Sequence, residues 1–311
     1  MADRIWLNLD PKKVDVSVLE RRFKEMNCEF TAEAVPGNDP EQVLQHALQA
    51  DVVISILEKW DAAMLEKVAA KVKFIQKYGA GLDNIDLDAA ERLGISVANV
   101  PGGNSAAVAE VALMHILNCG RRFVPCVTGV KHNIWPATIT GTELDGKTVG
   151  VMGYGNIARH LVRLLSGFQV KVLAYDAFIH QPLEGQKVTF VDSPEELFGQ
   201  SDIISLHIPC NEKTKGSINE KLFNCMKDGA IFVNTCRGGV VVEKDLVKAL
   251  QCGKILAAGL DVLAEEPPTV KNPLMQMENV FITSHMGAAS YESEERSQKI
   301  MADAIERFLK G

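Results

Sequence analysis

Residues 148–158 of this 311-residue chain read TVGVMGYGNIA, and this stretch decides the fold. A short apolar run leads into a G-x-G-x-x-G/A pattern that begins at Gly153. In such a pattern Gly153 permits a tight turn, Gly155 lets the backbone approach a pyrophosphate, and Ala158 lets a helix pack close to the sheet. The pyrophosphate would lie on the free N–H groups at the start of that helix. The stretch therefore predicts a strand, a turn and a helix that together bind a dinucleotide.

An acidic residue follows at the distance that this pattern requires. The next predicted strand, 171–175, ends before Asp176, which lies 23 residues after Gly153. An acid at this place accepts hydrogen bonds from the ribose hydroxyls and repels a 2′-phosphate. Residues 177–180 include no Arg that would hold such a phosphate. The sequence therefore favours NAD over NADP. The alternative interpretation is a chance pair of loop glycines followed by an unrelated surface Asp.

Outward from this stretch, short β-rich runs alternate with helical patterns along the whole chain. Strands alternating with helices predict parallel sheets covered on both faces. A Pro-Gly-Gly break at 101–103 interrupts the alternation, and 311 residues suffice for two domains. We expect an α/β protein with two doubly wound domains and a cleft between them. The predicted strands are 5–9, 51–57, 74–77, 95–100, 148–152, 171–175, 203–208, 230–234, 257–260 and 280–283, and the predicted helices 14–26, 62–70, 104–119, 156–166 and 290–310.

Composition narrows the classes of partner. The net charge is −7, and no run of Lys and Arg is long enough to bind a polyanion, so nucleic acid and anionic membranes are disfavoured. The first residues do not resemble a signal peptide, and no apolar stretch approaches 18 residues. The seven cysteines are scattered, without a CxxC pair or zinc spacing. We therefore expect a cytoplasmic protein with reduced thiols and no metal.

Three later strands of the predicted sheet run into charged residues of catalytic type. Arg237 follows strand 230–234, Asp261 and then Glu266 follow strand 257–260, and His285 follows strand 280–283. Ligands of open α/β sheets bind beyond the carboxyl ends of the strands. Arg can hold a carboxylate with two parallel hydrogen bonds, and His can give or take a hydroxyl proton while a carboxylate orients its ring. Singly, each residue is more often a surface charge or a structural histidine; together they predict an active site.

The remaining histidines are weaker candidates. His207, in the stretch His207-Ile208-Pro209 at a strand end, is expected to line the cofactor pocket. The others lie on predicted helices or loops and are not expected to be catalytic: His46, His115, His132, His160 and His180.

With these motifs in order, the chain resembles the D-isomer-specific 2-hydroxyacid dehydrogenase family over nearly its whole length. The glycine loop at Gly153 is one element of the resemblance. The others are Tyr78-Gly79-Ala80-Gly81-Leu82-Asp83-Asn84-Ile85-Asp86, Asn104-Ser105 with Val108-Ala109-Glu110, His207-Ile208-Pro209 followed by Thr214, Asn234-Thr235-Cys236-Arg237-Gly238, Gly259-Leu260-Asp261-Val262 with Glu266-Pro267, and Ser284-His285-Met286-Gly287.

The resemblance implies an architecture and a partner. A Rossmann NAD domain, residues 102–284, would be inserted in a flavodoxin-like substrate domain formed by residues 1–101 and 285–311. Family members are commonly dimers joined through the NAD domains, so we expect a homodimer of this kind.

The resemblance also implies roles for individual residues. Arg237 would bind and polarise the substrate, while His285, paired with Glu266, would act as the acid/base during hydride transfer between nicotinamide and a small 2-hydroxy or 2-keto acid. Asp261 would contact the nicotinamide carboxamide. The implied cofactor-binding set is Gly153, Tyr154, Gly155, Asn156, Ile157, Asp176, His207, Pro209, Thr214, Thr235, Cys236 and Asp261, and the implied substrate-binding set is Lys77, Tyr78, Gly79, Ala80 and Gly81, with backbone N–H groups near Ala80 and Gly81 holding the carboxylate.

Some features bear on which member this is. Asn156 stands where the family usually has Arg, leaving the backbone and Arg159 to hold the pyrophosphate. Asn104-Ser105 and Lys77 are similar to the 3-phosphoglycerate dehydrogenase branch, although Lys77 is not Arg and the chain ends at Gly311 without the expected regulatory domain. Formate dehydrogenases are disfavoured because they carry an amide at the position of Glu266.

Two other classes of function remain as alternatives. One is an NAD-sensing binding protein like the transcriptional corepressors that share this fold, which carry peptide-binding segments and long tails. The other is a non-redox Rossmann protein, which would not need Arg237, Glu266 and His285 together.

Overall fold

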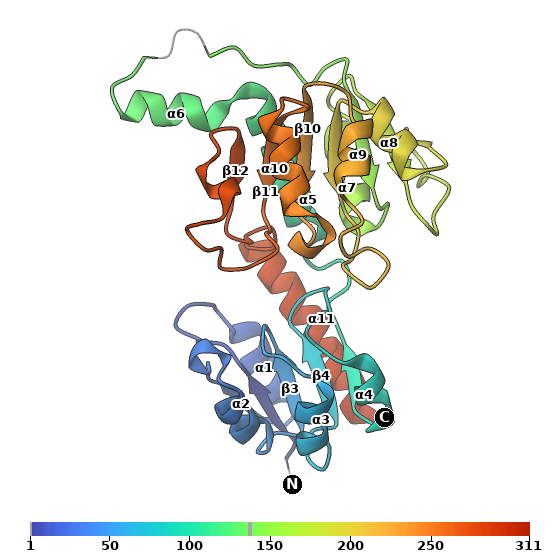
Figure 1. The fold of residues 1–311 in the computed structure, drawn as a ribbon. Helices are drawn as coiled ribbons and strands as arrows, with labels where there is room; N and C mark the ends of the chain where they lie inside the picture. Colours follow the sequence, from blue (N-terminus) through green and yellow to red (C-terminus); the bar gives the residue numbers. More distant parts are fainter. Residues whose placement is uncertain (1, 136–138) are drawn as a thin grey trace. The chain divides into compact units, whose positions relative to one another are not determined.

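The computed structural model describes residues 2–135 and 139–311, and the chain divides into two compact units (Figure 1). Unit 1 comprises Met1–Asn104 and Ser290–Gly311, and unit 2 comprises Ser105–Ala289. The divisions fall a few residues beyond the boundaries expected after residues 101 and 284. Unit 1 is thus discontinuous in sequence, with unit 2 inserted between its two segments.

Unit 1 is built on a parallel sheet of five strands in the order β2-β1-β3-β4-β5. This order is the one found in flavodoxin-like folds, which confirms the expected class. Apolar side chains on both faces of the strands explain why helices cover both sides. The strands are β1 (Arg4–Leu7), β2 (Glu29–Ala32), β3 (Val52–Ser55), β4 (Phe74–Lys77) and β5 (Ser96–Ala98).

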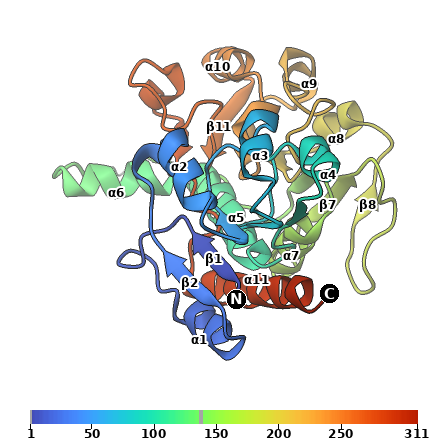
Figure 2. The same cartoon turned by 90° about the horizontal axis from the view of Figure 1, so that it is seen from below.

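The helices of unit 1 lie in two layers, which Figure 2 shows on opposite sides of β1 and β2. One layer holds α2 (Pro40–Ala47), α3 (Ala62–Val68) and α4 (Leu87–Arg92), and the other holds α1 (Ser17–Glu25) and α11 (Tyr291–Lys310). Side-chain oxygens of Asp61, Asp86 and Ser290 accept backbone N–H groups in the first turns of α3, α4 and α11. Such N-caps fix where a helix begins.

Unit 2 is built on a parallel sheet of seven strands in the order β12-β11-β10-β9-β6-β7-β8. Counted within the unit, this is the Rossmann order with one added strand, and it reverses between β6 and β9, which is where ligands bind in such sheets. The strands are β6 (Thr148–Met152), β7 (Lys171–Tyr175), β8 (Thr189–Phe190), β9 (Ile203–Leu206), β10 (Ala230–Asn234), β11 (Ile255–Leu260) and β12 (Val280–Ile282).

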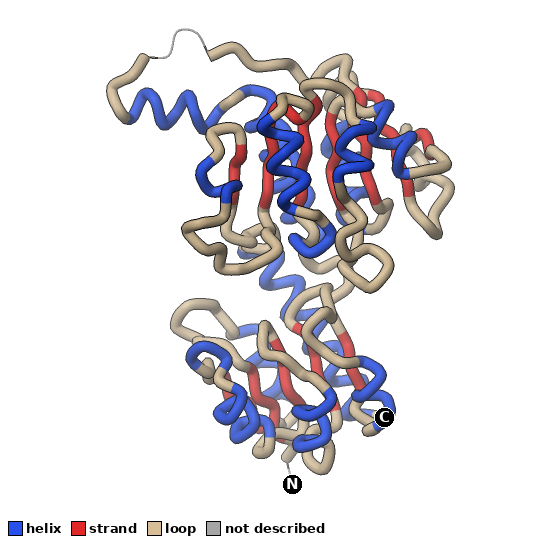
Figure 3. Tube along the Cα trace, viewed as in Figure 1, coloured by secondary structure: helices blue, strands red, loops and turns tan. Residues whose placement is uncertain are grey.

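Helices cover both faces of this sheet, as the blue helices around the red strands show in Figure 3. The face covered by α5 and α7 forms one apolar core, and the face covered by α8, α9 and α10 forms another. None of the residues of α6 is buried, and this helix projects away from the sheet of unit 2 (Figure 1). The helices are α5 (Ser105–Arg121), α6 (Phe123–Lys131), α7 (Asn156–Leu165), α8 (Pro194–Gln200), α9 (Glu220–Cys225) and α10 (Glu243–Gln251).

Several predicted boundaries are wrong by a few residues. The strand expected over 51–57 ends at Ser55, because the carboxylate of Glu58 accepts the N–H groups of Ile56 and Leu57. The strand expected over 203–208 ends at Leu206. Elements that were not predicted at all are β2, α2, α4, α6, β8, α8, α9 and α10.

Two kinds of feature are absent from the described residues. None of their helices is both long enough and apolar enough to cross a membrane. Nor do they contain a group of three or more His, Cys, Asp or Glu side chains placed to hold a metal ion.

Candidate active site

The glycine loop of unit 2 is shaped by close contact with the neighbouring strand end. Gly153 has φ +90°, and a Cβ at this residue would overlap the carbonyl of His207. Only glycine fits, because it tolerates positive φ and has no side chain. No atom lies within 4 Å of the place where a Cβ of Gly155 would be, and no side chain caps α7 in the described structure. The start of α7 can therefore receive an anion on its N–H groups.

Tyr154 contributes its backbone to this loop and buries its ring. The N–H of Tyr154 donates to Asp176 Oδ2 at 2.7 Å, while the hydroxyl bonds to Gln186. The guanidinium of Arg159 lies 5.4 Å from the centre of the Tyr154 ring, a cation–π arrangement. Asn156 and Ile157 form the first turn of α7.

Asp176 is held as an anion at the end of β7. Besides Tyr154, the N–H groups of Phe178 and Ile179 donate to its Oδ1 at 2.8 and 3.0 Å. Partial burial acts to raise the pKa of Asp176, but the three backbone donors outweigh burial and hold the pKa below its usual value. The carboxylate is thus ionised at neutral pH, as a group that repels a 2′-phosphate must be.

Two polar atoms at the carboxyl ends of neighbouring strands are enclosed and lack a partner among the described residues. They are Nδ1 of His207, after β9, and Oγ1 of Thr235, after β10, and neither bonds to a described residue. The other ring nitrogen of His207 lies 3.0 Å from Ser205 Oγ, and burial lowers the pKa of His207 to about 4. Because buried polar groups are nearly always hydrogen-bonded, these two atoms indicate a polar ligand. The donors and acceptors of a dinucleotide fit them.

The other expected cofactor contacts are held within their own loops. Thr214 Oγ1 donates to the carbonyl of Pro209 at 2.6 Å and closes a turn. The N–H and thiol of Cys236 both bond to Asn234 Oδ1, and burial raises the pKa of the Cys236 thiol to about 11. The thiol therefore stays neutral and unreactive at neutral pH.

Arg237 begins the loop that follows β10. It is half-buried, and its Nη1 donates to the carbonyl of Cys236 at 2.7 Å. A Cβ at the next residue, Gly238, would overlap the backbone of Leu263 and Ala264. The loop carrying Arg237 therefore lies directly against the loop that carries Glu266.

Glu266 and His285 form a hydrogen-bonded pair. Glu266 Oε2 lies 2.7 Å from His285 Nδ1, and its Oε1 accepts the N–H of Leu263 at 2.9 Å. The side chain of His285 remains 49% exposed. Because Nδ1 bonds to Glu266, Nε2 is the ring nitrogen through which a proton can pass to or from a substrate.

Asp261 is buried and binds the loop around His285. Its Oδ1 accepts the hydroxyl of Thr283 at 2.6 Å and the N–H of Met286 at 2.9 Å, and its Oδ2 accepts the N–H of Gly287 at 2.7 Å. The role expected for Asp261 was a contact with the nicotinamide carboxamide. In the structure its carboxylate holds the segment that carries His285.

The expected substrate loop lies in unit 1, after β4. The hydroxyl of Tyr78 bonds to Glu294, and Asn99 Nδ2 donates to the carbonyl of Ala80 at 2.6 Å. Gly79 has φ +142°, which favours glycine. The N–H groups of Ala80 and Gly81 have no acceptor among the described residues. They are free to bind an anion.

A lysine that binds a substrate phosphate has to be accessible, whereas Lys77 is buried. It is only 8% exposed, and its Nζ donates to the carbonyl of Ile56. The buried carboxylate of Glu58 lies close enough to interact electrostatically with it, and burial raises the pKa of that carboxyl. The amine of Lys77 therefore bonds to the backbone of unit 1.

Sequence reasoning missed two residues of the unit 2 site. His115 on α5 was set aside as a helix residue, and Thr283 was regarded only as the end of a strand. The structure joins them, with Nε2 of His115 3.0 Å from Oγ1 of Thr283. The available signal was Gly259, whose missing side chain leaves space for the ring of His115.

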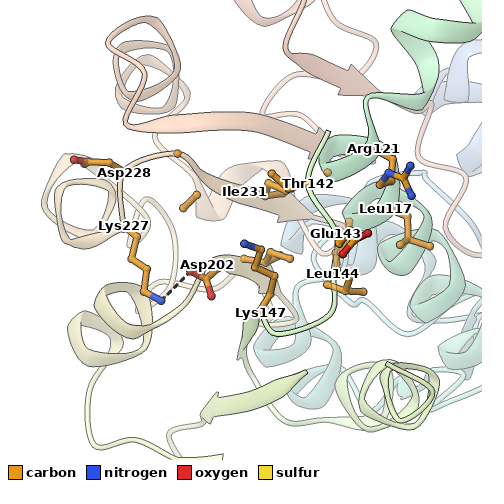
Figure 4. Close-up of a pocket in the computed structure, with 15 residues that line it drawn as sticks. Leu117, Arg121, Thr142, Glu143, Leu144, Lys147, Asp202, Lys227, Asp228 and Ile231 are labelled. Carbon is orange, nitrogen blue, oxygen red and sulfur yellow. Dashed lines mark hydrogen bonds and ion pairs between the residues drawn. The ribbon is translucent and has the colours of Figure 1, made fainter. Parts of the chain in front are cut away.

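A pocket at the opposite end of the strands of the same sheet does not belong to this site (Figure 4). It measures about 140 Å³ and lies where β6, β9 and β10 begin. Lys227 and Asp202 form an ion pair of 2.9 Å at its wall. The glycine loop, where a dinucleotide would bind, is at the other end of the strands.

Comparisons with known proteins agree with this geometry. The family model "D-isomer specific 2-hydroxyacid dehydrogenase, NAD binding domain" matches residues 113–287. A D-3-phosphoglycerate dehydrogenase of Methanocaldococcus jannaschii is 38% identical over 90% of this chain, which spans only 53% of that protein's length. A hydroxypyruvate reductase of Thermotoga maritima is 36% identical over 86% of this chain and 90% of its own.

Solved structures are similar along the whole chain. A glyoxylate reductase from Paecilomyes thermophila has a TM-score of 0.90 at 26% identity, covering 99% of this chain and 96% of that one. A D-lactate dehydrogenase from Aquifex aeolicus, solved with NAD and lactic acid, has a TM-score of 0.86 at 28% identity, covering 99% and 96%. This chain therefore belongs to the D-isomer specific 2-hydroxyacid dehydrogenases, a family of NAD-dependent oxidoreductases.

Proposed function

We propose that this protein interconverts a small D-2-hydroxy acid and its 2-keto acid, with Arg237, Glu266 and His285 as its catalytic residues. The observation that carries the proposal is the 2.7 Å bond between Glu266 and His285. The loop that carries Glu266 packs directly against the loop that carries Arg237. An imidazole oriented by a carboxylate beside a guanidinium is the set of groups that reduction of a keto acid needs.

The cofactor's place follows from the loop geometry. NAD, when bound, supplies or accepts the hydride. The backbone of Gly153 to Ile157 would hold its pyrophosphate, and Asp176 would accept its ribose hydroxyls. The enclosed atoms of His207 and Thr235 would then gain hydrogen-bond partners. Pro209, Thr214 and Cys236 would shape the pocket without bonding through their side chains.

The chain's own residues would do the following in the reducing direction. Arg237 holds the substrate carboxylate with two hydrogen bonds and polarises the adjacent carbonyl. His285, protonated and hydrogen-bonded to Glu266, donates its Nε2 proton to the carbonyl oxygen as that oxygen becomes a hydroxyl. In the oxidising direction neutral His285 removes the hydroxyl proton. In unit 1, the N–H groups of Ala80 and Gly81 are donors that could bind a carboxylate, as the family resemblance implies.

We propose that the substrate carries no phosphate. A phosphate dianion requires accessible cations. Lys77, the basic residue expected to serve it, is buried, donates to Ile56 and lies next to the carboxylate of Glu58. Glyoxylate and hydroxypyruvate need no such cation, and reductases for them are among the relatives.

3-Phosphoglycerate is the second candidate substrate. It is favoured by the 38% identity to two archaeal D-3-phosphoglycerate dehydrogenases, of which this chain spans 53% and 49%. Measured substrate preference separates an unphosphorylated acid from 3-phosphoglycerate, because only 3-phosphoglycerate carries a phosphate that Lys77 would have to bind.

We further propose a homodimer in the cytoplasm, formed through the NAD domains. α6 projects from unit 2 without a buried residue, and large apolar side chains are exposed on it and just after it (Figure 1). Phe123 is 63% exposed and Trp135 84% exposed. Exposed apolar clusters of this kind mark protein interfaces. The seven cysteines are free thiols, as expected in a reducing compartment.

The test is an NADH-oxidation screen of the purified protein over glyoxylate, hydroxypyruvate, pyruvate, 2-ketogluconate, longer keto acids and phosphohydroxypyruvate. We expect turnover of at least one unphosphorylated acid with kcat above about 1 s⁻¹. Preference for phosphohydroxypyruvate would favour the second candidate. Absence of turnover with every acid would favour an NAD-sensing binding protein.

A further inference from the structure

A buried histidine outside the three catalytic residues is linked by hydrogen bonds to the loop of His285. His115 lies on α5 and is only 2% exposed. Its Nε2 lies 3.0 Å from Thr283 Oγ1, which lies 2.6 Å from Asp261 Oδ1. The chain of contacts therefore runs from His115 through Thr283 to Asp261.

The direction of these hydrogen bonds follows from the chemistry of the groups. Asp261 offers acceptor oxygens, so the hydroxyl proton of Thr283 points to Asp261. The oxygen of Thr283 can then only accept from His115, which requires a proton on Nε2. Burial lowers the pKa of His115, against a smaller opposing effect of Asp261, so the ring is neutral at neutral pH and carries its proton on Nε2.

Asp261 connects this chain of hydrogen bonds to the catalytic histidine. Its two oxygens accept the N–H groups of Met286 and Gly287, the residues directly after His285. Its backbone carbonyl accepts the N–H of His285 itself at 2.9 Å. His285 has φ +54°, a strained value for a residue with a side chain. The backbone at His285 keeps this conformation because Asp261 holds it from both sides.

His115 is itself held in one position. A Cβ on Gly259 would come within 2.6 Å of the Cβ of His115, so the strand and the helix are in direct contact there. Nδ1 of His115 is enclosed and bonds to no described residue. An enclosed, unpartnered nitrogen lowers stability. An apolar side chain would pack here without that cost, so stability alone does not explain a histidine at this place.

We infer that His115 is a positioning residue for the reaction, acting through Thr283 and Asp261 on the backbone conformation of His285. The inference rests on the proposed role of His285 as acid/base. His115 touches neither substrate nor cofactor in this account. It supplies one N–H that fixes the hydroxyl of Thr283, and thereby the orientation of the Asp261 carboxylate.

The test compares His115→Leu, His115→Gln, Thr283→Val and the double variant His115→Leu/Thr283→Val with the whole wild-type protein. We expect His115→Leu to lower kcat about five- to tenfold, the effect of losing one buried hydrogen bond. Its Tm should equal or exceed the wild-type value, and NADH affinity should stay within about twofold. Gln can donate an N–H to Thr283, so His115→Gln should recover at least half of the lost rate. His46→Leu, at a histidine of unit 1, is the matched control and should keep wild-type kcat.

The double variant distinguishes a shared chain of hydrogen bonds from two separate effects. Residues acting through one chain give a double variant no slower than the slower single variant, whereas independent effects multiply. A His115→Leu enzyme with wild-type kcat, multiplied effects, or a rate loss matched by a fall in Tm would overturn the inference. Failure of the proposed function would instead appear as an inactive wild-type protein, which would remove both.

Discussion

Gly238 and Leu263 lie in backbone contact, so close that a single methyl group on Gly238 would overlap the carbonyl of Leu263. Arg237 precedes one of these residues, and the N–H of Leu263 donates to Glu266. The contact therefore fixes the loop of the guanidinium against the loop of the carboxylate. Two groups that we propose to be catalytic, on loops that follow different strands, are thus held against each other by a contact that only a residue without a side chain permits.

Gly238→Ala should accordingly lower both stability and activity. Backbone cannot move aside as a flexible side chain can, so we expect a loss of about 1–3 kcal/mol in the free energy of unfolding. Urea unfolding and kcat measure the two effects. Gly167→Ala is the control, since a Cβ there meets only one atom, at 4.0 Å, and should change stability by less than about 0.5 kcal/mol. Equal behaviour of the two variants would argue against the tight contact.

Asp176 should determine the choice between NADH and NADPH. Its carboxylate is ionised because three backbone N–H groups lower its pKa. Asp176→Ser removes the charge that repels a 2′-phosphate, and the ratio of kcat/KM for NADH to that for NADPH should fall at least about tenfold. Asp192→Asn, at an exposed acid nearby in sequence, should leave the ratio unchanged. A ratio unaffected by Asp176→Ser would mean that another group selects the cofactor.

The stability of the protein without cofactor should decrease in mild acid because of His207. Burial lowers its pKa from 6.5 to about 4, so the unfolded chain binds a proton that the folded protein excludes. The stabilisation is complete above pH 6.5 and is lost as the pH falls toward 4, amounting to about 2 kcal/mol between pH 7.5 and 5. The variant His207→Gln lacks this titrating group. Between pH 7.5 and 5 the free energy of unfolding, measured in urea, should therefore fall by about 2 kcal/mol less in the variant than in the wild-type protein. If the free energy of unfolding had the same pH dependence in the wild-type protein and in His207→Gln, the burial of the His207 ring would be contradicted.

The dimer should depend on the apolar side chains at α6. Phe123→Asp and Trp135→Asp place charges on residues that the proposed interface would bury, and each should shift the protein toward monomer at micromolar concentration. Sedimentation equilibrium measures the mass. Val270→Asp, at a residue 84% exposed elsewhere on unit 2, should leave the dimer intact. A wild-type protein with the mass of a single chain would refute the dimer.

The sequence predicted the site through local patterns. The run around Gly153 and the acid at Asp176 follow rules that depend only on spacing, and the parallel sheets were expected from the alternation of strands with helices. The pairing of Glu266 with His285 was expected from the resemblance. These features survive because each depends on neighbours in the chain or on the ends of parallel strands.

The features that could not be predicted from the sequence depend on contacts between segments that are distant in the chain. The bond from His115 to Thr283 joins residues 168 positions apart, and its signal, Gly259, is far from His115 in the sequence. Lys77 Nζ donates to the carbonyl of Ile56, which follows the neighbouring strand β3 and is 21 positions away in the sequence. Short helices such as α9 carry too few apolar positions to show a period. Such features appear only when the strands have been placed side by side.

We propose that His285, oriented by Glu266, transfers the proton, and two measurements on the variant His285→Ala examine this role. Steady-state turnover of the best keto acid and NADH affinity by fluorescence titration should be taken on the same preparation. We predict that kcat falls at least about 100-fold, the usual contribution of a general acid, while the Kd of NADH stays within about twofold. A His285→Ala protein that turns over within about threefold of wild type would contradict the account.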